Sequence, residues 1–102
     1  MPQNKRIVFS EELQKQARFA QAMCHPARIK IMNLLNDYEF LICTNLVDFL
    51  PYSQPGVSYH LDIMLEAGLI KRVSKFGSVG YQISREGCEI AKVSFQHIAS
   101  IF

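Results

Sequence analysis

The fold of this chain follows from one stretch of sequence, Ser53-Gln54-Pro55-Gly56-Val57-Ser58-Tyr59-His60-Leu61, which continues to Glu66-Ala67-Gly68. Ser53 is a good helix N-cap, because its hydroxyl can accept a hydrogen bond from a free backbone N–H of the first turn. Pro55 falls within that turn, where a missing N–H costs little. Gly68 can adopt the left-handed conformation that ends many helices. The stretch therefore predicts a helix that begins at Ser53 and ends before Gly68.

Helical spacing gives this predicted helix two different faces. Val57, Leu61 and Met64 fall at positions i, i+4 and i+7, so we expect them to form one buried stripe. The opposite face is polar and consists of Gln54, Ser58, Tyr59, Asp62 and Glu66. A helix N-terminus surrounded by Gln, Ser, Tyr and His side chains is typical of a recognition helix, which enters the major groove of DNA.

A shorter helix is predicted just before the recognition helix. Residues 44–50 place their apolar side chains on one side, and Pro51-Tyr52 ends the helical pattern. Only a few residues then separate the two helices, which is the length of the turn in a helix-turn-helix motif. Residues 40–42 before it form a short extended piece, and residues 36–39 form a turn.

Two more helices are predicted towards the N-terminus. Residues 10–23 begin at Ser10, a good N-cap, and carry an apolar line made by Leu13, Ala17 and Ala20. The next helix, residues 26–36, opens with a proline at its first position and leaves Arg28 at its flank.

The hydrophobic period changes from 3.6 to 2 after Gly68. Residues 69–75 and 79–83 are therefore predicted to be two strands, with Phe76-Gly77-Ser78 at the tip of their hairpin. A hairpin that follows a recognition helix is a wing. Its basic residues Lys71, Arg72 and Lys75 are expected to contact DNA phosphates.

A last helix is predicted over residues 86–102. Its apolar residues repeat at spacings of 3, 4, 3 and 4, which is the pattern of a seam between two helices: Cys88, Ala91, Phe95, Ile98 and Phe102. We interpret this seam as part of a symmetric dimer contact with the first helix, through Leu13, Ala17 and Ala20. The alternative is that the last helix packs on the core of its own chain.

The composition sets the limits of this interpretation. A chain of 102 residues is expected to form one domain. We divide it into an N-terminal arm (1–9), two dimerisation helices (10–23 and 86–102) and the winged helix-turn-helix between those helices. The net charge of +2 is weak support for a nucleic-acid partner. Without a long apolar run or a signal peptide, we expect a cytoplasmic protein with no membrane partner. Three cysteines fit reduced thiols better than disulfides.

The order of these elements, mainly α with a small β-hairpin wing, resembles the ArsR/SmtB family of bacterial winged helix-turn-helix repressors. The resemblance covers residues 10–102, with its most specific match at residues 53–61. Further matches are Cys24-His25-Pro26-Ala27-Arg28-Ile29-Lys30-Ile31 at the second helix, Glu66-Ala67-Gly68-Leu69-Ile70 at the entry to the wing, Gly77 and Tyr81.

The resemblance implies a homodimer that represses transcription from a two-fold-symmetric, palindromic DNA operator until an inducer releases it. It implies that Gln54, Ser58 and Tyr59 face bases, with Ser53 and His60 towards the backbone or the groove wall. His60 also lies at the edge of the buried stripe, so a hydrogen-bonded boundary residue is an equal alternative for it. The wing cations, Lys71, Arg72 and Lys75, would contact phosphates. Asp62, Leu65 and Ser78 depart from the family, because basic residues often stand at those positions.

The inducer cannot be assigned from the sequence. Many family members bind a metal through a Cys-x-Cys pair, but here the matching place holds Leu41-Ile42-Cys43. Cys24 and His25 could join Cys43 as ligands, although no spacing requires it. Glu89 and His97 are a poor ligand set on the last helix. We therefore expect no metal and no cofactor.

A thiol switch is another possibility. Cys43 and Cys88 could approach each other, or the Cys88 residues of two chains could meet near the dimer axis. A switch requires thiolate character and exposure. A position on an apolar seam instead favours Cys88 as a small buried hydrophobic residue.

Two other classes of function compete with a DNA-binding regulator. A winged-helix module that binds proteins rather than DNA is motivated by Asp62, Leu65 and the low net charge, whereas Gln54 and Ser58 argue against it. An enzyme is disfavoured, because the sequence shows no nucleophile with a partnered base, no phosphate-binding glycine loop and no suitable carboxylate pair.

Overall fold

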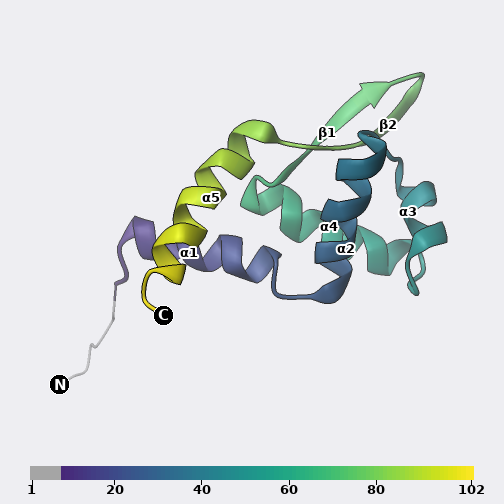
Figure 1. Cartoon of the computed structure of the whole chain (residues 1–102). Helices are drawn as coiled ribbons and strands as arrows, with labels where there is room; N and C mark the ends of the chain where they lie inside the picture. Colours follow the sequence, from purple (N-terminus) through teal and green to yellow (C-terminus); the bar gives the residue numbers. More distant parts are fainter. Residues whose placement is uncertain (1–7) are drawn as a thin grey trace.

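The computed structural model describes residues 8–102, so seven of the nine residues of the expected N-terminal arm lie outside the described part. The described chain contains five helices and one antiparallel hairpin (Figure 1). In chain order the elements are α1 (Glu11–Ala22), α2 (Pro26–Tyr38), α3 (Cys43–Phe49), α4 (Gln54–Ala67), β1 (Ile70–Lys75), β2 (Ser78–Ile83) and α5 (Arg85–Ala99). The predicted winged helix-turn-helix is confirmed.

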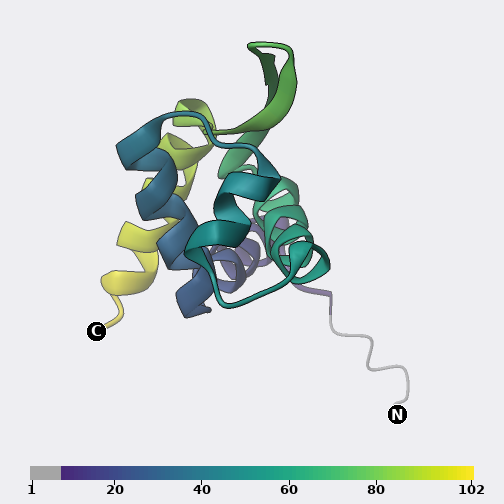
Figure 2. The same ribbon diagram turned by 90° about the vertical axis from the view of Figure 1, so that its right-hand side faces the viewer.

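The helices pack around one apolar core, and the hairpin extends away from them (Figures 1 and 2). α4 lies centrally, because it contacts α1, α2, α3 and β1. α5 packs mainly on α1. The largest fully buried apolar side chains come from α2, α3 and α4 and include Ile31, Leu35, Leu46, Leu61 and Met64. This core fixes the back of α4, so that its polar face is left to the solvent.

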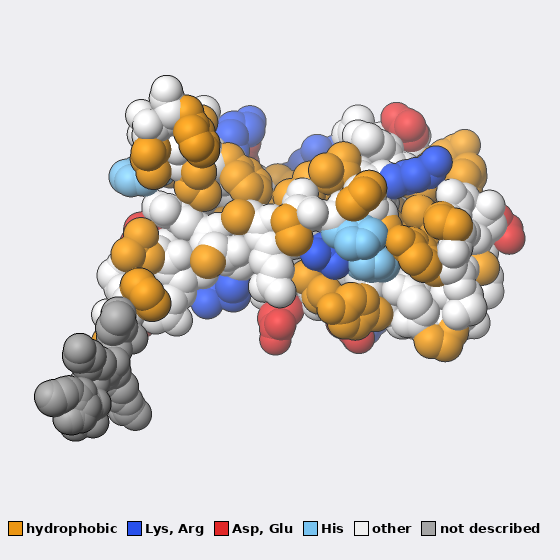
Figure 3. All heavy atoms as spheres, turned by 90° about the horizontal axis from the view of Figure 1, so that it is seen from below, with side chains coloured by type: hydrophobic (Ala, Val, Ile, Leu, Met, Phe, Trp, Pro, Cys, Tyr) orange, Lys and Arg blue, Asp and Glu red, His pale blue; other side chains and the backbone are white. Residues whose placement is uncertain are grey.

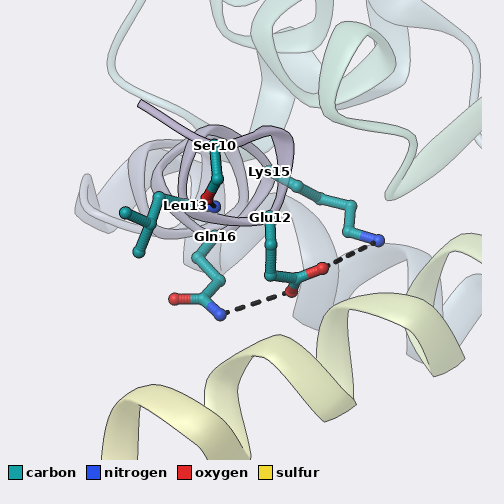
Figure 4. A network of polar contacts seen from close by, with 5 residues as sticks. All are labelled: Ser10, Glu12, Leu13, Lys15 and Gln16. Carbon is teal, nitrogen blue, oxygen red and sulfur yellow. Dashed lines mark hydrogen bonds and ion pairs between the residues drawn. The ribbon is translucent and has the colours of Figure 1, made fainter. Parts of the chain in front are cut away.

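The first turn of α1 is stabilised by its own side chains. The Ser10 hydroxyl accepts a hydrogen bond from the backbone N–H of Leu13 at 3.2 Å, as expected for an N-cap. Glu12 contacts Lys15 at 3.6 Å and accepts a hydrogen bond from Gln16 at 3.3 Å. Leu13 points to a different side of the helix from Glu12 and Gln16 (Figure 4). Leu13 therefore remains exposed, whereas Gln16 is buried.

α2 is longer than its sequence predicts. The turn expected at residues 36–39 is wrong, because the helix continues to Tyr38 and ends at Glu39, whose φ is 68°. Tyr38 packs against Phe49 of α3 with ring centroids 5.6 Å apart. This aromatic contact between helices explains the extra half-turn.

The helix-turn-helix consists of α3 and α4, and the predicted end of α4 at Gly68 is confirmed. Gly68 adopts φ 82°, the left-handed conformation. Ser53 is the N-cap residue by position, but its side chain makes no capping hydrogen bond. The Ser53 hydroxyl is therefore not used within the helix.

The wing is a two-stranded hairpin that a third segment joins by one bridge. β1 and β2 pair from Ile70↔Ile83 to Lys75↔Ser78, and the turn between them has φ 54° at Phe76 and φ 77° at Gly77. The extended piece at residues 40–42 adds two backbone hydrogen bonds. The N–H of Leu41 donates to the Tyr81 carbonyl at 3.2 Å, and the Tyr81 N–H donates to the Leu41 carbonyl at 2.8 Å.

α5 begins against the end of α4, where Gly87 allows a very close approach. A Cβ atom added at Gly87 would lie 1.7 Å from the carbonyl oxygen of Gly68. The Ser84 hydroxyl caps this helix by accepting a hydrogen bond from the Gly87 N–H at 3.1 Å. The start of α5 is thereby held on the joint between the recognition helix and the wing.

The face of α5 that the sequence assigns to a dimer seam lies partly in the core of its own chain. Ala91 is buried, and Phe95 packs against Phe19 of α1 with ring centroids 6.4 Å apart. Ala91 is therefore corrected to a core residue of its own chain, and the assignment of half-buried Phe95 to a seam between chains stays a prediction. The helix also ends at Ala99, so Phe102 lies beyond it and is exposed.

Candidate nucleic-acid interface

The outer face of α4 carries the polar side chains that the sequence predicts. Gln54 and Ser53 are exposed at its N-terminal end, Ser58 is half-buried, and 63% of Tyr59 is exposed. On the inner face, the predicted stripe of Val57, Leu61 and Met64 is confirmed, since all three are fully buried. The N-terminus of α4 also carries the positive end of the helix dipole, which favours a negatively charged partner.

Ser58 contacts the neighbouring helix of the motif. Its hydroxyl lies 3.8 Å from the Cys43 thiol, the first residue of α3. This contact between side chains spans the turn of the helix-turn-helix. It holds Ser58 at the border between the core and the exposed face of α4.

His60 belongs to the inner face of α4 rather than to its outer surface. Only 6% of its side chain is exposed, and its Nδ1 lies 2.8 Å from Nη1 of Arg28. A guanidinium group only donates hydrogen bonds, so Nδ1 must be the acceptor and the imidazole must be neutral. The expectation that His60 points to the DNA backbone or groove wall is therefore corrected.

Arg28 connects three parts of the fold, although the sequence places it at the flank of its helix. Only 5% of the residue is exposed. Its Nε donates to the carbonyl of Ala22 at 3.1 Å, and its Nη2 donates to the carbonyl of Gln21 at 2.9 Å. Both carbonyls belong to the last turn of α1, and the Gln21 carbonyl also accepts a hydrogen bond from the Cys24 N–H at 3.2 Å. Arg28 thus joins the end of α1 to the recognition helix through His60.

A second histidine and a tyrosine, both half-buried, pack beside the buried pair of Arg28 and His60. His25 is the N-cap of α2, and its Nδ1 accepts a hydrogen bond from the Ala27 N–H at 3.0 Å. Its ring centroid lies 4.6 Å from that of His60, and the ring of Tyr52 lies 5.3 Å from His60. Histidine side chains gather among hydrophobic ones on this face of the molecule, with Lys or Arg atoms beside them (Figure 3). We call Arg28, His25, His60 and Tyr52 the histidine cluster.

Acidification is expected to destabilise the fold through the histidine cluster. Burial, followed by the charges of His25 and Arg28, lowers the pKa of His60 below its ordinary value of 6.5. The unfolded chain therefore binds the proton first as pH falls. The contribution of neutral His60 to stability is fully present above about pH 6.5 and is lost below it. Urea unfolding at a series of pH values measures this loss.

Substitution of His60 by Asn is expected to reduce the loss of stability in acid, because an amide oxygen can accept the hydrogen bond from Arg28 without titrating. His97→Asn is the matched control, because His97 is exposed on α5. An acid destabilisation that is the same in His60→Asn and in the unsubstituted protein would contradict this assignment.

The basic residues of the wing do not lie on one face of the hairpin. Lys71, Arg72 and Lys75 are all exposed on β1. Because successive strand residues point to opposite faces, Lys71 and Lys75 share one face and Arg72 lies on the other. The Arg72 guanidinium carbon lies 5.9 Å from the ring centroid of Tyr81. The predicted cationic cluster is therefore divided between the two faces of the wing.

The three cysteines occupy different environments. Cys24 is exposed and lies 3.5 Å from Arg28 Nη2, and Cys43 contacts Ser58. The Cys88 thiol points to the Leu69 carbonyl at 3.6 Å, and burial raises its pKa. A raised pKa disfavours the reactive thiolate. Within residues 8–102 all three are free thiols, and no three Cys, His, Asp or Glu side chains form a group that could hold a metal.

Known proteins resemble this chain in the sequence of the helix-turn-helix and in the fold. A family model described as bacterial regulatory protein, arsR family, matches residues 25–72, from the N-cap of α2 into β1. An HTH-type transcriptional regulator of Methanocaldococcus jannaschii is 33% identical over 61 residues, which cover 60% of this chain and 68% of that protein. The chain belongs to the ArsR family.

Two solved structures extend this likeness beyond the matched residues. The transcriptional repressor PagR of Bacillus anthracis is 30% identical with a TM-score of 0.63, and the match covers 79% of this chain and 93% of PagR. An ArsR-like transcriptional regulator from Rhodococcus sp. RHA1 is 18% identical with a TM-score of 0.75, over 89% and 85% of the two chains. Helix-turn-helix regulators of the ArsR family bind double-stranded DNA. In residues 8–102, each helix is too short or too polar to cross a membrane.

The histidine cluster is the part of this ArsR-family site that sequence reasoning missed. Three of its members stand in two separate motifs, His25-Pro26-Ala27-Arg28 and Tyr59-His60-Leu61, and Tyr52 lies between α3 and α4. A signal was present, because a histidine beside a buried stripe needs a hydrogen-bond partner. Nothing in the spacing, however, identifies that partner as Arg28.

Proposed function

We propose that the protein is a transcriptional repressor that binds a palindromic operator as a homodimer, with one α4 in each major-groove half-site. The observation that carries this proposal is the outward face of α4. It presents Gln54, Ser58 and Tyr59 at the N-terminal half of a helix whose opposite face is fully buried. Repression is supported by the likeness to PagR, which is described as a repressor.

The side chains on α4 suit the edges of base pairs. Glutamine can form two hydrogen bonds with adenine in the major groove, and serine can bond to several bases. Tyr59 can donate or accept a hydrogen bond through its hydroxyl. Ser53 is proposed to contact a phosphate, because its exposed hydroxyl is not used for capping. His60 instead supports α4 from behind.

The homodimer is supported by apolar side chains that stay exposed on α1 and α5. Leu13, Ala17 and Ala20 lie exposed on α1. On the outer face of α5, 65% of Val93 is exposed, and Ile90 is exposed as well. We propose that these two surfaces meet their copies across a two-fold axis. From the predicted seam, Phe95, Ile98 and Phe102 can still contribute to this contact, whereas Cys88 and Ala91 pack within their own chain.

DNA binding is expected to be strongly salt-dependent, with two chains per duplex. The duplex is selected from a random library by the full chain, and fluorescence anisotropy measures affinity at several salt concentrations. Substitution of Lys71, Arg72 or Lys75 by Gln should each lower the slope of log affinity against log salt by about two units, because each of the two chains loses one phosphate contact. Gln54→Ala should relax base preference without changing that slope.

Lys92→Gln is the matched control for the charge substitutions. Lys92 is exposed on α5, where it pairs with Glu89 at 3.4 Å, and the proposal gives it no contact with DNA. Its removal should leave the salt slope unchanged. If the folded dimer binds no selected duplex, the DNA-binding proposal fails and a protein-binding winged helix becomes the better assignment.

A further inference from the structure

The tip of the wing carries an aromatic side chain in an unusual place. Phe76 is 90% exposed, and its φ of 54° is positive. Turns with positive φ normally use Gly, Asn or Asp, and a bulky residue there is strained. Strain of this kind is often retained where a residue has a function.

Phe76 is supported from the body of the protein rather than loosely attached. Its ring meets that of Phe40 edge to face, with centroids 5.9 Å apart. Phe40 precedes Leu41, whose backbone is bonded to β2. The Lys75 ammonium lies 5.9 Å from the Phe40 ring centroid. The ring at the tip is therefore presented on a fixed base, with a cation beside it.

We propose that Phe76 is an apolar wedge that enters the minor groove of DNA beside the half-site read by α4 and partly unstacks one base step. The inference rests on the proposed function, because it needs a bound duplex. Phenylalanine is one of the side chains that proteins insert between base steps from the minor groove.

The charges of the wing fit the same placement. A minor groove has a phosphate backbone on each side and base edges on its floor. Lys71 and Lys75 lie on one face of the hairpin and Arg72 on the other, so a wing inserted edge-on can reach both backbones. Phe76 is then directed to the floor of the groove. The step it opens is expected to be TA or CA/TG, because pyrimidine–purine steps unstack most easily.

The exposed aromatic side chains of the helices do not share these features. Tyr38 and Phe49 are exposed, but they pack on each other and lie on α2 and α3. Tyr59 lies on α4, among the residues proposed to read bases. Phe76 differs because it combines a projecting position, an apolar ring and flanking cations.

The test uses the full chain and a duplex that it has selected, with 2-aminopurine placed in turn at the steps flanking the half-site. Binding of the unsubstituted protein should raise 2-aminopurine fluorescence at one flanking step, and energy transfer between dyes on the duplex ends should report a bend. Phe76→Asn should abolish both signals and weaken binding about tenfold, with an unchanged salt slope. Asn tolerates a positive φ, so this variant should fold at least as well.

Phe76→Leu is the matched rescue, because leucine also acts as a wedge and should retain much of both signals. Tight binding by Phe76→Asn with the same fluorescence and bend would overturn the wedge and leave the proposed repressor intact. If the unsubstituted protein bound no duplex, both proposals would fail. The wedge proposal would also be overturned if Phe76→Asn kept its DNA affinity and instead lost binding to a protein partner.

Discussion

Gly87→Ala is expected to destabilise the protein by about 3 kcal/mol or more, because a methyl group at this position collides with the backbone. The added Cβ atom would lie 1.7 Å from the Gly68 carbonyl oxygen and 2.8 Å from the carbonyl carbon. A flexible side chain could move aside, but the C-cap of α4 cannot move without disturbing the recognition helix. Urea unfolding followed by circular dichroism, at one protein concentration, measures the change.

Glu86→Ala is the matched control for this substitution. Glu86 is exposed in the same first turn of α5, so its loss removes only a favourable charge near the helix N-terminus. We expect a change of less than about 1 kcal/mol. Similar unfolding midpoints for Gly87→Ala and Glu86→Ala would mean that α5 does not need its close approach to Gly68.

Arg28→Met is expected to destabilise the protein by about 3 kcal/mol and to weaken DNA binding more than this loss of folded protein explains. Methionine is long and apolar, so it keeps much of the packing. It removes the donor to the Ala22 carbonyl and to Nδ1 of His60, and it leaves the Gln21 carbonyl with only the Cys24 N–H. The recognition helix then loses its polar link to α1. Urea unfolding, together with anisotropy titrations of fully folded protein, measures both effects.

Lys30→Met is the control for Arg28→Met, because Lys30 lies exposed on the same helix. It should change stability by less than about 0.5 kcal/mol. If Arg28→Met is as stable as Lys30→Met, the hydrogen bonds of Arg28 are replaced by water and the histidine cluster does not hold α4. If only stability falls, the cluster supports the fold without positioning the recognition helix.

Local signals were enough to predict α4 and the wing. The conformation of Gly68, the buried stripe of Val57, Leu61 and Met64, and the change of period after Gly68 each depend on neighbouring residues. The outward position of Gln54 and Tyr59 follows from the same helical spacing. These features are encoded within one or two helical turns, so a single sequence can specify them.

Contacts between distant residues could not be predicted in this way. Arg28 and His60 are 32 positions apart, and a long cationic side chain at a helix flank is more often solvated than buried. The stripe of α5 is ambiguous for a different reason. Spacings of three and four describe any apolar helix face, and they do not distinguish packing on Phe19 of the same chain from packing on a second copy.

The two hydrogen bonds between Leu41 and Tyr81 have a consequence for the arrangement of target sites. They join the segment before α3 to β2, so we expect the helix-turn-helix and the wing to keep a fixed relative position. If their relative position is fixed, the distance along the duplex between the contact made by α4 and the contact made by the wing is fixed as well. An operator with one base pair inserted between the major-groove half-site and its flank would shift the flank by about 3.4 Å and rotate it by about a tenth of a turn. The protein should therefore accept changes of sequence in that interval more readily than changes of its length.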